Sequence, residues 1–417
     1  MEENREQWGT KMGFILAAIG SAVGLGNIWR YPYVVYSSGG GAFLIPYFFA
    51  IFTAGIPLLI LEYGMGHKFR GSTPLSLARA NKKFEWFGWW AIISSSIILC
   101  YYSMILSWAM KYLTLSFNKG WGEDANAFFY NDFLKLSSSP LSIDKIIVSV
   151  LIGIAIIWLM NWFICYKGVK VGIEKMNKIL LPCLLVIMII IVIRGVTLEG
   201  AEVGLNRLFT PDWEKVKDPK VFTMMGIWGN ILGILFFVCL VCAGITSAVS
   251  LVEAIAAAIM DKFGWAREKV VTGICAIGFL ISTVFATNAG LYLLDIMDSF
   301  INNYGIVTVG LLEAFVIGWI IKPKEIREHT NRISYFKIGR WWDLIIKYVT
   351  PTLLVISLIQ SLVTEFKAPY GGYDLIALFL YGWLVIALGI IGGLLISKKP
   401  WKIESKFDKK RGVNIND

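Results

Sequence analysis

The chain has 417 residues, of which 57% are hydrophobic and 16% are charged, and its mean hydropathy is +0.65. Soluble domains carry about 25% charged residues, so this composition excludes an ordinary soluble protein and indicates a polytopic membrane protein. The net charge of +10 does not indicate a nucleic-acid partner, because no basic face with aromatic readers is evident. Neither a P-loop nor a histidine-based catalytic pattern is present, so we expect no enzyme activity.

Ten apolar stretches are long enough, at about 20 residues each, to cross a bilayer as helices. We therefore expect an all-α polytopic membrane protein with about ten transmembrane helices and no separate soluble domain. The first stretch is too long to be a cleavable signal peptide. The expected spans are residues 12–35, 42–66, 86–114, 145–165, 176–194, 226–258, 268–288, 299–321, 343–363 and 374–397.

Lysine and arginine gather in loops that all fall on one side of the membrane if the ten spans are real. Cytoplasmic loops carry an excess of these two residues. The sequence thus predicts a multi-pass protein of the plasma membrane with both termini in the cytoplasm. The basic segments are residues 67–85, 167–175, 262–269, 322–342 and 398–411.

The first span contains an interruption, "SAVGLGNIWRYPY", with Gly24, Gly26, Asn27 and Arg30 at membrane depth. An unwound membrane helix frees N–H and C=O groups that lipid cannot satisfy, so such breaks survive where the backbone lines a cavity. Discontinuous helices of this kind form the substrate and ion sites of secondary transporters. Glycines at this spacing also allow close helix packing. The amide and the guanidinium favour a functional site, because intramembrane polar groups usually mark function.

Longer segments resemble one family across nearly the whole chain. The chain resembles the neurotransmitter:sodium symporters, secondary transporters with the leucine-transporter fold, in "REQWGTKMGFILAAIGSAVGLGNIWRYPY", "GGGAFLIPY", "GIPLLILEYGMG", "IILCYYSMILSW", "GLNRLFTPDWEKVKDP", "CAGITSAVSLVEA" and "LLDIMDSF". This resemblance implies a leucine-transporter-like fold whose first helix is discontinuous. It also implies sodium-coupled transport across the lipid bilayer, without an organic cofactor.

The resemblance implies two sodium sites. In the family, one ion lies between the unwound first helix and the eighth helix, and it is held by neutral oxygens, which suit a hard cation. The corresponding ligands are the carbonyls of Gly20, Val23 and Ala243 and the hydroxyls of Thr246 and Ser247. For the other ion, the implied ligands are the carbonyl of Ala22 and the amide of Asn27.

The implied substrate is an amino acid, apolar or neutral. In the family, the tyrosine at the position of Tyr102 hydrogen-bonds the substrate carboxylate, and backbone amides of the unwound segment assist. Monoamine-transporting relatives have an aspartate at the position of Gly24, whereas glycine suits a zwitterion with its own carboxylate. Ile98 and Leu251 suggest an apolar pocket, and helix packing is an equal alternative for these two. The substrate set is Ser21, Ala22, Gly24, Leu25, Gly26, Ile98, Tyr102, Ser247 and Leu251.

Charged residues at both ends of the central site match the family's gates. The resemblance implies that Arg30 faces Asp298 on the outer side, with Tyr102 beneath, and Asp295 is the rival partner of Arg30. On the cytoplasmic side Arg5 should face Asp261. The intramembrane acids Glu62, Glu253 and Glu313 should point inward, neutral or hydrogen-bonded, because lipid-facing carboxylates are very costly.

The chain departs from the family near Phe222–Thr223, where "KDPKVF" is followed at once by "TMMGIWGNILGILFFVCLVCAGITSAVS". The family has five plus five helices in inverted repeats, usually followed by two more. We therefore expect a single domain, 1–417, with an incomplete inverted repeat. Residues 1–222 match the first five helices and an external loop, and 223–417 match the eighth to twelfth.

This departure leaves two classes of function open. One is a sodium-coupled amino-acid symporter, impaired or not by the missing helices. The other is a non-transporting membrane protein that retains the scaffold for binding or regulation. A homodimer is also open.

Overall fold

The computed structural model describes residues 8–38, 40–209 and 228–402. Within these ranges the chain forms helices and one isolated β-bridge, between Ile146 and Thr287. In this described part of the chain, nine helical stretches are long and apolar enough to cross a membrane, and a bent pair of helices near the N-terminus, counted as one span, makes ten. The predicted all-α fold with about ten spans and a discontinuous first helix is confirmed.

The observed spans differ from the expected ones mainly at their ends. The stretch expected at 299–321 begins at Gly290 instead, because Asp295 and Asp298 lower the apolar signal of this segment although both are hydrogen-bonded in the fold. The bent pair is Lys11–Ala22 with Gly26–Tyr36, and the other spans are Gly41–Phe69, Lys82–Leu115, Val148–Tyr166, Val169–Val196, Ile231–Phe263, Arg267–Ala286, Gly290–Ile321, Trp341–Gly372 and Leu375–Lys398.

Short π-helical and 3₁₀ turns divide many of these spans into shorter α-helices. The α-helices are α1 (Lys11–Ala22), α2 (Tyr31–Ser37), α3 (Gly41–Ala50), α4 (Ile56–Phe69), α5 (Thr73–Ala80), α6 (Glu85–Leu115), α7 (Ala125–Ala127), α8 (Val148–Tyr166), α9 (Lys175–Val196), α10 (Ala201–Phe209), α11 (Trp228–Phe263), α12 (Arg267–Ser282), α13 (Gly290–Phe300), α14 (Val307–Phe315), α15 (Pro323–Ile333), α16 (Trp341–Leu344), α17 (Thr350–Lys367), α18 (Leu375–Leu378) and α19 (Leu384–Lys398).

The two longest helices, α6 and α11, form the interior of the bundle. They pack against each other, α11 also against α9 and α12, and α6 also against α8 and α19. About half of the most apolar stretch is buried in each, 56% in Lys82–Leu115 and 50% in Ile231–Phe263. By contrast, only 11% of that stretch is buried in Gly41–Phe69, which contains α3 and α4. The core is therefore built on α6 and α11, while α3 and α4 lie at the periphery.

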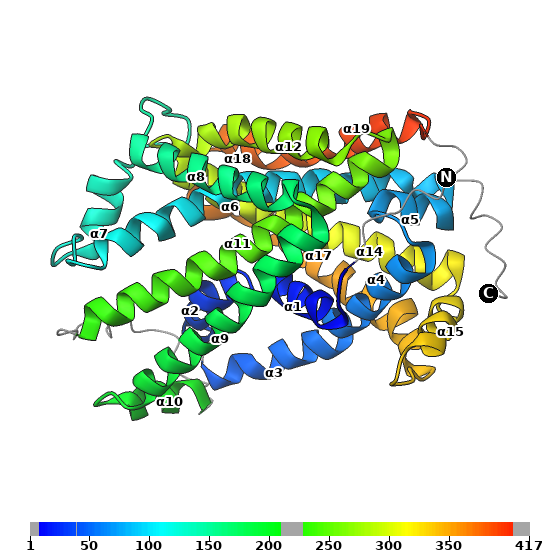
Figure 1. Cartoon of the computed structure of the whole chain (residues 1–417), viewed down its shortest axis with the longest axis horizontal. Helices are drawn as coiled ribbons and strands as arrows, with labels where there is room; N and C mark the ends of the chain where they lie inside the picture. Colours follow the sequence, from blue (N-terminus) through cyan, green and yellow to red (C-terminus); the bar gives the residue numbers. More distant parts are fainter. Residues whose placement is uncertain (1–7, 39, 210–227, 403–417) are drawn as a thin grey trace.

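The loops sort to the two ends of the bundle as the charge pattern predicts. Helices α5 and α15, which lie in the basic segments 67–85 and 322–342, are at the right-hand end in Figure 1. Helix α7, which lies between α6 and α8, and helix α10, which follows α9, are at the opposite end (Figure 1). Which end faces the cytoplasm stays a prediction.

Candidate functional site

The first membrane crossing breaks where the glycines predicted it. Helix α1 ends at Ala22, and Val23 leaves helical geometry with φ −83° and ψ 89°. The helix resumes at Gly26 in a direction bent by 54°. Within the break, the N–H of Asn27 donates to the carbonyl of Gly24 at 3.2 Å. The bend releases backbone carbonyls from the helical ladder and turns them toward α11.

Thr246 of α11 meets the last turn of α1. Its hydroxyl lies 3.0 Å from the carbonyl oxygen of Gly20 and 2.9 Å from that of Ala243, and the residue is 1% exposed. A Cβ on Gly20 would lie 2.5 Å from Oδ1 of Asn177 on α9 and 3.2 Å from Cβ of Thr246. Glycine at position 20 therefore allows the three helices to approach closely and brings its carbonyl to the hydroxyl.

Ser247 completes a cluster of neutral oxygens. Its hydroxyl lies 3.2 Å from the carbonyl oxygen of Gly20, and 3.3 Å from the carbonyl oxygens of both Ser21 and Val23. A hydroxyl has two lone pairs, so it can turn its proton away and offer them to a cation that the surrounding carbonyls also face. The structure thus brings together all five oxygens expected to hold one sodium ion, and the Ser21 carbonyl lies beside them.

The amides of the break are held by two side chains. Oδ1 of Asn27 accepts a hydrogen bond from the N–H of Gly24 at 3.0 Å, and the phenol oxygen of Tyr102 accepts one from the N–H of Leu25 at 3.0 Å. The Asn27 amide oxygen therefore caps the broken segment. Its expected role as a sodium ligand together with the carbonyl of Ala22 stays a prediction.

Position 24 points into the space between these groups. A Cβ on Gly24 would lie 3.3 Å from the Tyr102 phenol oxygen, 3.5 Å from Oγ of Ser247 and 4.0 Å from Oδ1 of Asn27. A longer side chain there would occupy the space over the tyrosine hydroxyl. Glycine leaves this space to a ligand, and the Tyr102 O–H can donate to an anionic group within it.

The expected apolar side chains gather near the same place. Leu25 is 2% exposed and belongs to the main core cluster, and Ile98 and Leu251 pack against that cluster while partly exposed. Gly26 faces open space, with no atom within 4 Å of where its Cβ would be. This arrangement suits an apolar pocket and ordinary packing equally, so the roles of Ile98 and Leu251 stay predictions.

On one side of the break, Arg30 pairs with Asp298, as expected. Nη1 of Arg30 lies 2.8 Å from Oδ2 of Asp298, and the arginine side chain is 61% exposed. The other carboxylate oxygen accepts hydrogen bonds from the hydroxyl of Tyr101 at 3.0 Å and from Nδ2 of Asn302 at 2.8 Å. Tyr101 contacts the carboxylate, whereas the Tyr102 hydroxyl contacts the N–H of Leu25, so the expected place of Tyr102 beneath this pair stays a prediction.

Asp295, the rival partner of Arg30, is engaged elsewhere. Its two oxygens accept hydrogen bonds from the hydroxyls of Tyr370 at 3.0 Å and Tyr373 at 2.8 Å. Burial, followed by the hydrogen bond to Asp295, raises the pKa of Tyr373 above its ordinary value, so its hydroxyl remains a donor at neutral pH. The loop between α17 and α18 is thereby tied to α13, one turn from Asp298.

At the other end of the bundle, Asp261 accepts a hydrogen bond from the N–H of Ser72 at 2.8 Å. Arg5, its expected partner, lies outside the described residues. Glu253 hydrogen-bonds the guanidinium of Arg267, and Nε of Arg267 donates to the carbonyl of Cys165 at 2.9 Å. The sequence predicted an inward hydrogen-bonded Glu253 but missed its cationic partner.

The other two intramembrane acids face each other. The carboxyl groups of Glu62 and Glu313 lie near one another, and Glu313 is 9% exposed whereas Glu62 is exposed. Two neighbouring carboxyl groups avoid two like charges when one of them keeps its proton. Glu313 is therefore buried, as expected, whereas Glu62 is exposed on the side of α4, so the expected inward orientation of Glu62 is not borne out.

Comparison with known proteins decides the family. The profile of the Sodium:neurotransmitter symporter family matches residues 5–127, 121–228 and 222–398. An uncharacterized sodium-dependent transporter of Methanocaldococcus jannaschii is 33% identical over 481 residues, which cover 94% of this chain and 98% of that protein. The chain belongs to the sodium:neurotransmitter symporter family. It is thus a sodium-dependent membrane transporter by family and not an enzyme.

Other members of the sodium:neurotransmitter symporter family agree in fold and extent. The crystal structure of MhsT in complex with L-phenylalanine superposes with a TM-score of 0.71 at 27% identity, covering 86% of this chain and 100% of that chain. The sodium- and chloride-dependent taurine transporter of Canis lupus familiaris is 24% identical over 512 residues, 92% of this chain and 82% of that protein. The leucine-transporter-like fold is therefore confirmed.

Proposed function

We propose that the chain binds and transports an apolar or neutral amino acid together with sodium across the plasma membrane. The observation that carries this proposal is the convergence of the Thr246 and Ser247 hydroxyls on the carbonyls of Gly20 and Val23 at the break of α1. These groups carry no formal charge, so they can hold a monovalent cation without the desolvation cost of a buried carboxylate. Ions and substrate would then share one broken helix.

The polar groups beside the break support an amino acid as the substrate. The Tyr102 hydroxyl and the space above Gly24 can receive a carboxylate, while Leu25, Ile98 and Leu251 offer apolar surface. MhsT, which has this fold, was crystallised with L-phenylalanine. An amino acid with an apolar side chain therefore suits the site, because its carboxylate meets polar groups and its side chain meets apolar ones.

Equilibrium binding of radiolabelled L-phenylalanine and L-leucine to the purified chain in detergent tests this proposal. We expect saturable binding in sodium chloride that is lost when potassium replaces sodium. Tyr102→Phe removes one hydroxyl and should weaken binding by about tenfold, because a hydrogen bond to a charged group is worth about 1.5 kcal/mol or more. Tyr112→Phe is the matched control, since this tyrosine lies on the same helix almost three turns further along, among aromatic rings. Equal binding in potassium, or equal loss in both variants, would contradict the proposal.

A second candidate, a binding protein that does not transport, is favoured by the length of the relatives. The alignment with the Methanocaldococcus protein contains 94% of a 417-residue chain but extends over 481 residues. That protein thus has on the order of 90 residues without a counterpart here, enough for two spans of about 20 residues with their loops. Two of the profile matches meet at 222–228, close to Phe222–Thr223. This junction lies outside the described residues.

Transport and binding can be separated in proteoliposomes. An inward sodium gradient should drive uptake of the labelled amino acid if the chain is a symporter. Sodium-dependent binding without uptake would favour the second candidate, and uptake that collapses in potassium would exclude it. The mass of the natural protein, compared with 46.8 kDa, decides whether the approximately 90 residues are absent from it.

A further inference from the structure

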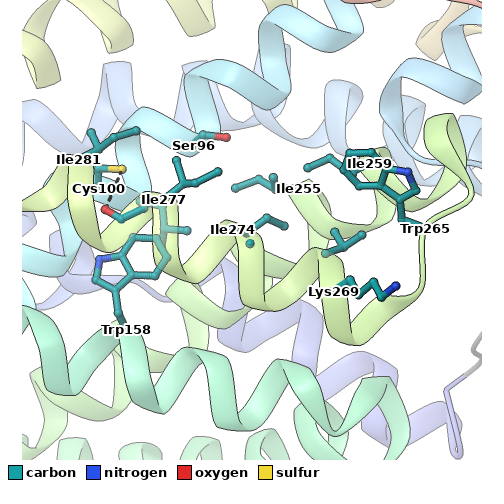
Figure 2. Close-up of a pocket in the computed structure, with 14 residues that line it drawn as sticks. Ser96, Cys100, Trp158, Ile255, Ile259, Trp265, Lys269, Ile274, Ile277 and Ile281 are labelled. Carbon is teal, nitrogen blue, oxygen red and sulfur yellow. Dashed lines mark hydrogen bonds between the residues drawn. The ribbon is translucent and has the colours of Figure 1, made fainter.

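A long apolar groove lies on the side of the bundle, away from the break in α1. One face of α12 forms its length, with Lys269, Gly273, Ile277 and Ile281 following one another at helical spacing. Helices α6 and α11 line the opposite wall through Leu99, Cys100, Ile255 and Ile259, as Figure 2 shows for the labelled members. Ile277 and Ile281 are 60% and 52% exposed, so the groove opens sideways toward the membrane.

The interior of the groove offers a ligand almost no polar group. The Ser96 hydroxyl donates back to the carbonyl of Ile92 at 2.8 Å. The Trp158 indole lies against Gly278, where a Cβ would come within 2.1 Å of the ring, and its N–H donates to Ser282 at 3.0 Å. Trp158 therefore closes the far end with its polar atom already paired, and the groove selects hydrocarbon.

The dimensions of the groove match one hydrocarbon chain. Lys269 and Ile281 are separated by about 18 Å along the helix axis, comparable with one leaflet of a hydrocarbon core about 30 Å thick. The groove volume is about 260 Å³. A hydrocarbon chain is about 4 Å across, the contact distance of carbon atoms. One extended hydrocarbon chain can therefore lie along the groove.

One mouth of the groove carries an interfacial pair. Lys269 is exposed in the first turn of α12, and Trp265, 53% exposed, lies in the short connection from α11 (Figure 2). Tryptophan is typical of the membrane–water interface. A lysine there attracts anionic lipids by about 1 kcal/mol. We propose that this groove binds one acyl chain of a phospholipid with an anionic headgroup, the headgroup lying at Lys269 and the chain running along α12 to Trp158.

Gly273 makes the proposal testable without disturbing the core. No atom lies within 4 Å of where its Cβ would be, so Gly273→Phe can fill the groove without a backbone clash. Gly195→Phe on α9 is the matched control, because that glycine also faces open space. For the headgroup, Lys269→Gln is compared with Lys398→Gln, which removes a lysine from the last turn of α19.

The assay is native mass spectrometry of the delipidated full chain, titrated with phosphatidylglycerol or phosphatidylcholine of identical acyl chains. We expect one tight phosphatidylglycerol adduct, with about fivefold weaker phosphatidylcholine binding, the factor that about 1 kcal/mol gives. Lys269→Gln should abolish the preference, and Gly273→Phe should abolish the tight adduct. Both control variants should behave as the unmodified chain. Gly273→Leu serves as a smaller plug if the phenylalanine variant is not monodisperse.

Three results would overturn the proposal. Unchanged phosphatidylglycerol binding by both position-273 variants would place the lipid elsewhere. Equal binding of both lipids by the unmodified chain would remove the headgroup contact. A dimer that Gly273→Phe converts to monomers would show that a second copy occupies the groove. None of these results bears on sodium or amino-acid binding, so the proposed function is tested separately.

Discussion

Replacing Thr246 by valine and Ser247 by alanine should abolish the protection that sodium gives the chain against thermal unfolding. The two hydroxyls supply two of the five oxygens at the proposed ion site, and the other three are backbone carbonyls that no substitution removes. The hydroxyls also donate to the Gly20 carbonyl, so the double variant loses some stability without sodium. The informative quantity is therefore the difference between sodium and potassium within each variant.

The expected loss follows from the two missing ligands. A contact between a hydroxyl and a charged group contributes at least about 1.5 kcal/mol, so removing both weakens sodium binding by about 3 kcal/mol, or over 100-fold. At a sodium concentration 100 times the dissociation constant, an ion that binds only the folded state adds about 2.7 kcal/mol. In the double variant the same concentration is below the new dissociation constant, and the protection falls to about 0.3 kcal/mol.

Unfolding curves in matched sodium and potassium chloride, followed by tryptophan fluorescence in detergent, measure this difference. Ser250→Ala is the control, because its hydroxyl donates to the Thr246 carbonyl at 3.0 Å one turn further along α11. It should keep the full sodium effect. If the double variant keeps as much sodium protection as the control, the two hydroxyls only bond back to carbonyls of their own helix or brace α1, and the site is wrongly assigned.

Three further predictions concern topology, the outer pair and the C-terminal segment. Single cysteines at Lys82 and Asn126, in a background without the native six, should label from opposite sides of the membrane, and labelling of both from outside intact cells would refute the topology. Asp298→Asn should lower the free energy of unfolding by less than about 1 kcal/mol, because its partner Arg30 is largely exposed, and a larger drop in the melting curve would give the pair a structural role. Trp401→Ala should lower the free energy of unfolding by about 3 kcal/mol in the same melting assay, since Trp401 is 6% exposed and its indole hydrogen-bonds a buried carboxylate. Trp401→Phe should lower it by less, because the phenylalanine ring keeps part of the packing. Equal losses in the two variants would assign the whole effect to the hydrogen bond.

The sequence predicts the fold well where one local signal suffices. Apolar length locates the spans, and the glycines of the first span locate the break between Ala22 and Gly26. The pairing of Arg30 with Asp298 required the family resemblance, because 268 residues separate them. The structure adds the reason that Asp295 is not the partner, namely the two tyrosine hydroxyls that occupy it.

Contacts between distant segments were missed because no periodicity reports them. The N–H of Trp401 reaches Glu85 at 3.1 Å, and Glu85 also pairs with Lys262 at 2.5 Å although both side chains are fully buried. Likewise, ring nitrogens of His67 and His329 lie 3.0 Å apart. Burial of the His329 ring and then the nearby His67 lower the pKa of His329, which favours the neutral imidazole that such a contact requires. In the sequence, each residue of these pairs is visible only as a polar residue near the end of a helix. Nothing in the sequence indicates its partner.

The position of the oxygen cluster indicates that sodium binding and transport depend on different parts of this chain. The cluster joins α1 to α11, and α11 with α6 forms the buried interior, so half of the proposed site rests on the most buried part of the bundle. The rest of the proposed site has little protein packed around it. Gly26 faces open space, and only 11% of the apolar stretch that contains α3 and α4 is buried. Backbone groups freed at the break must find water or another partner there, since lipid supplies none. An ion held by α1 and α11 needs only the scaffold, whereas alternating access needs a second surface that moves against it. Loss of transport with retention of sodium binding would therefore place the defect in the second surface and leave the ion site intact.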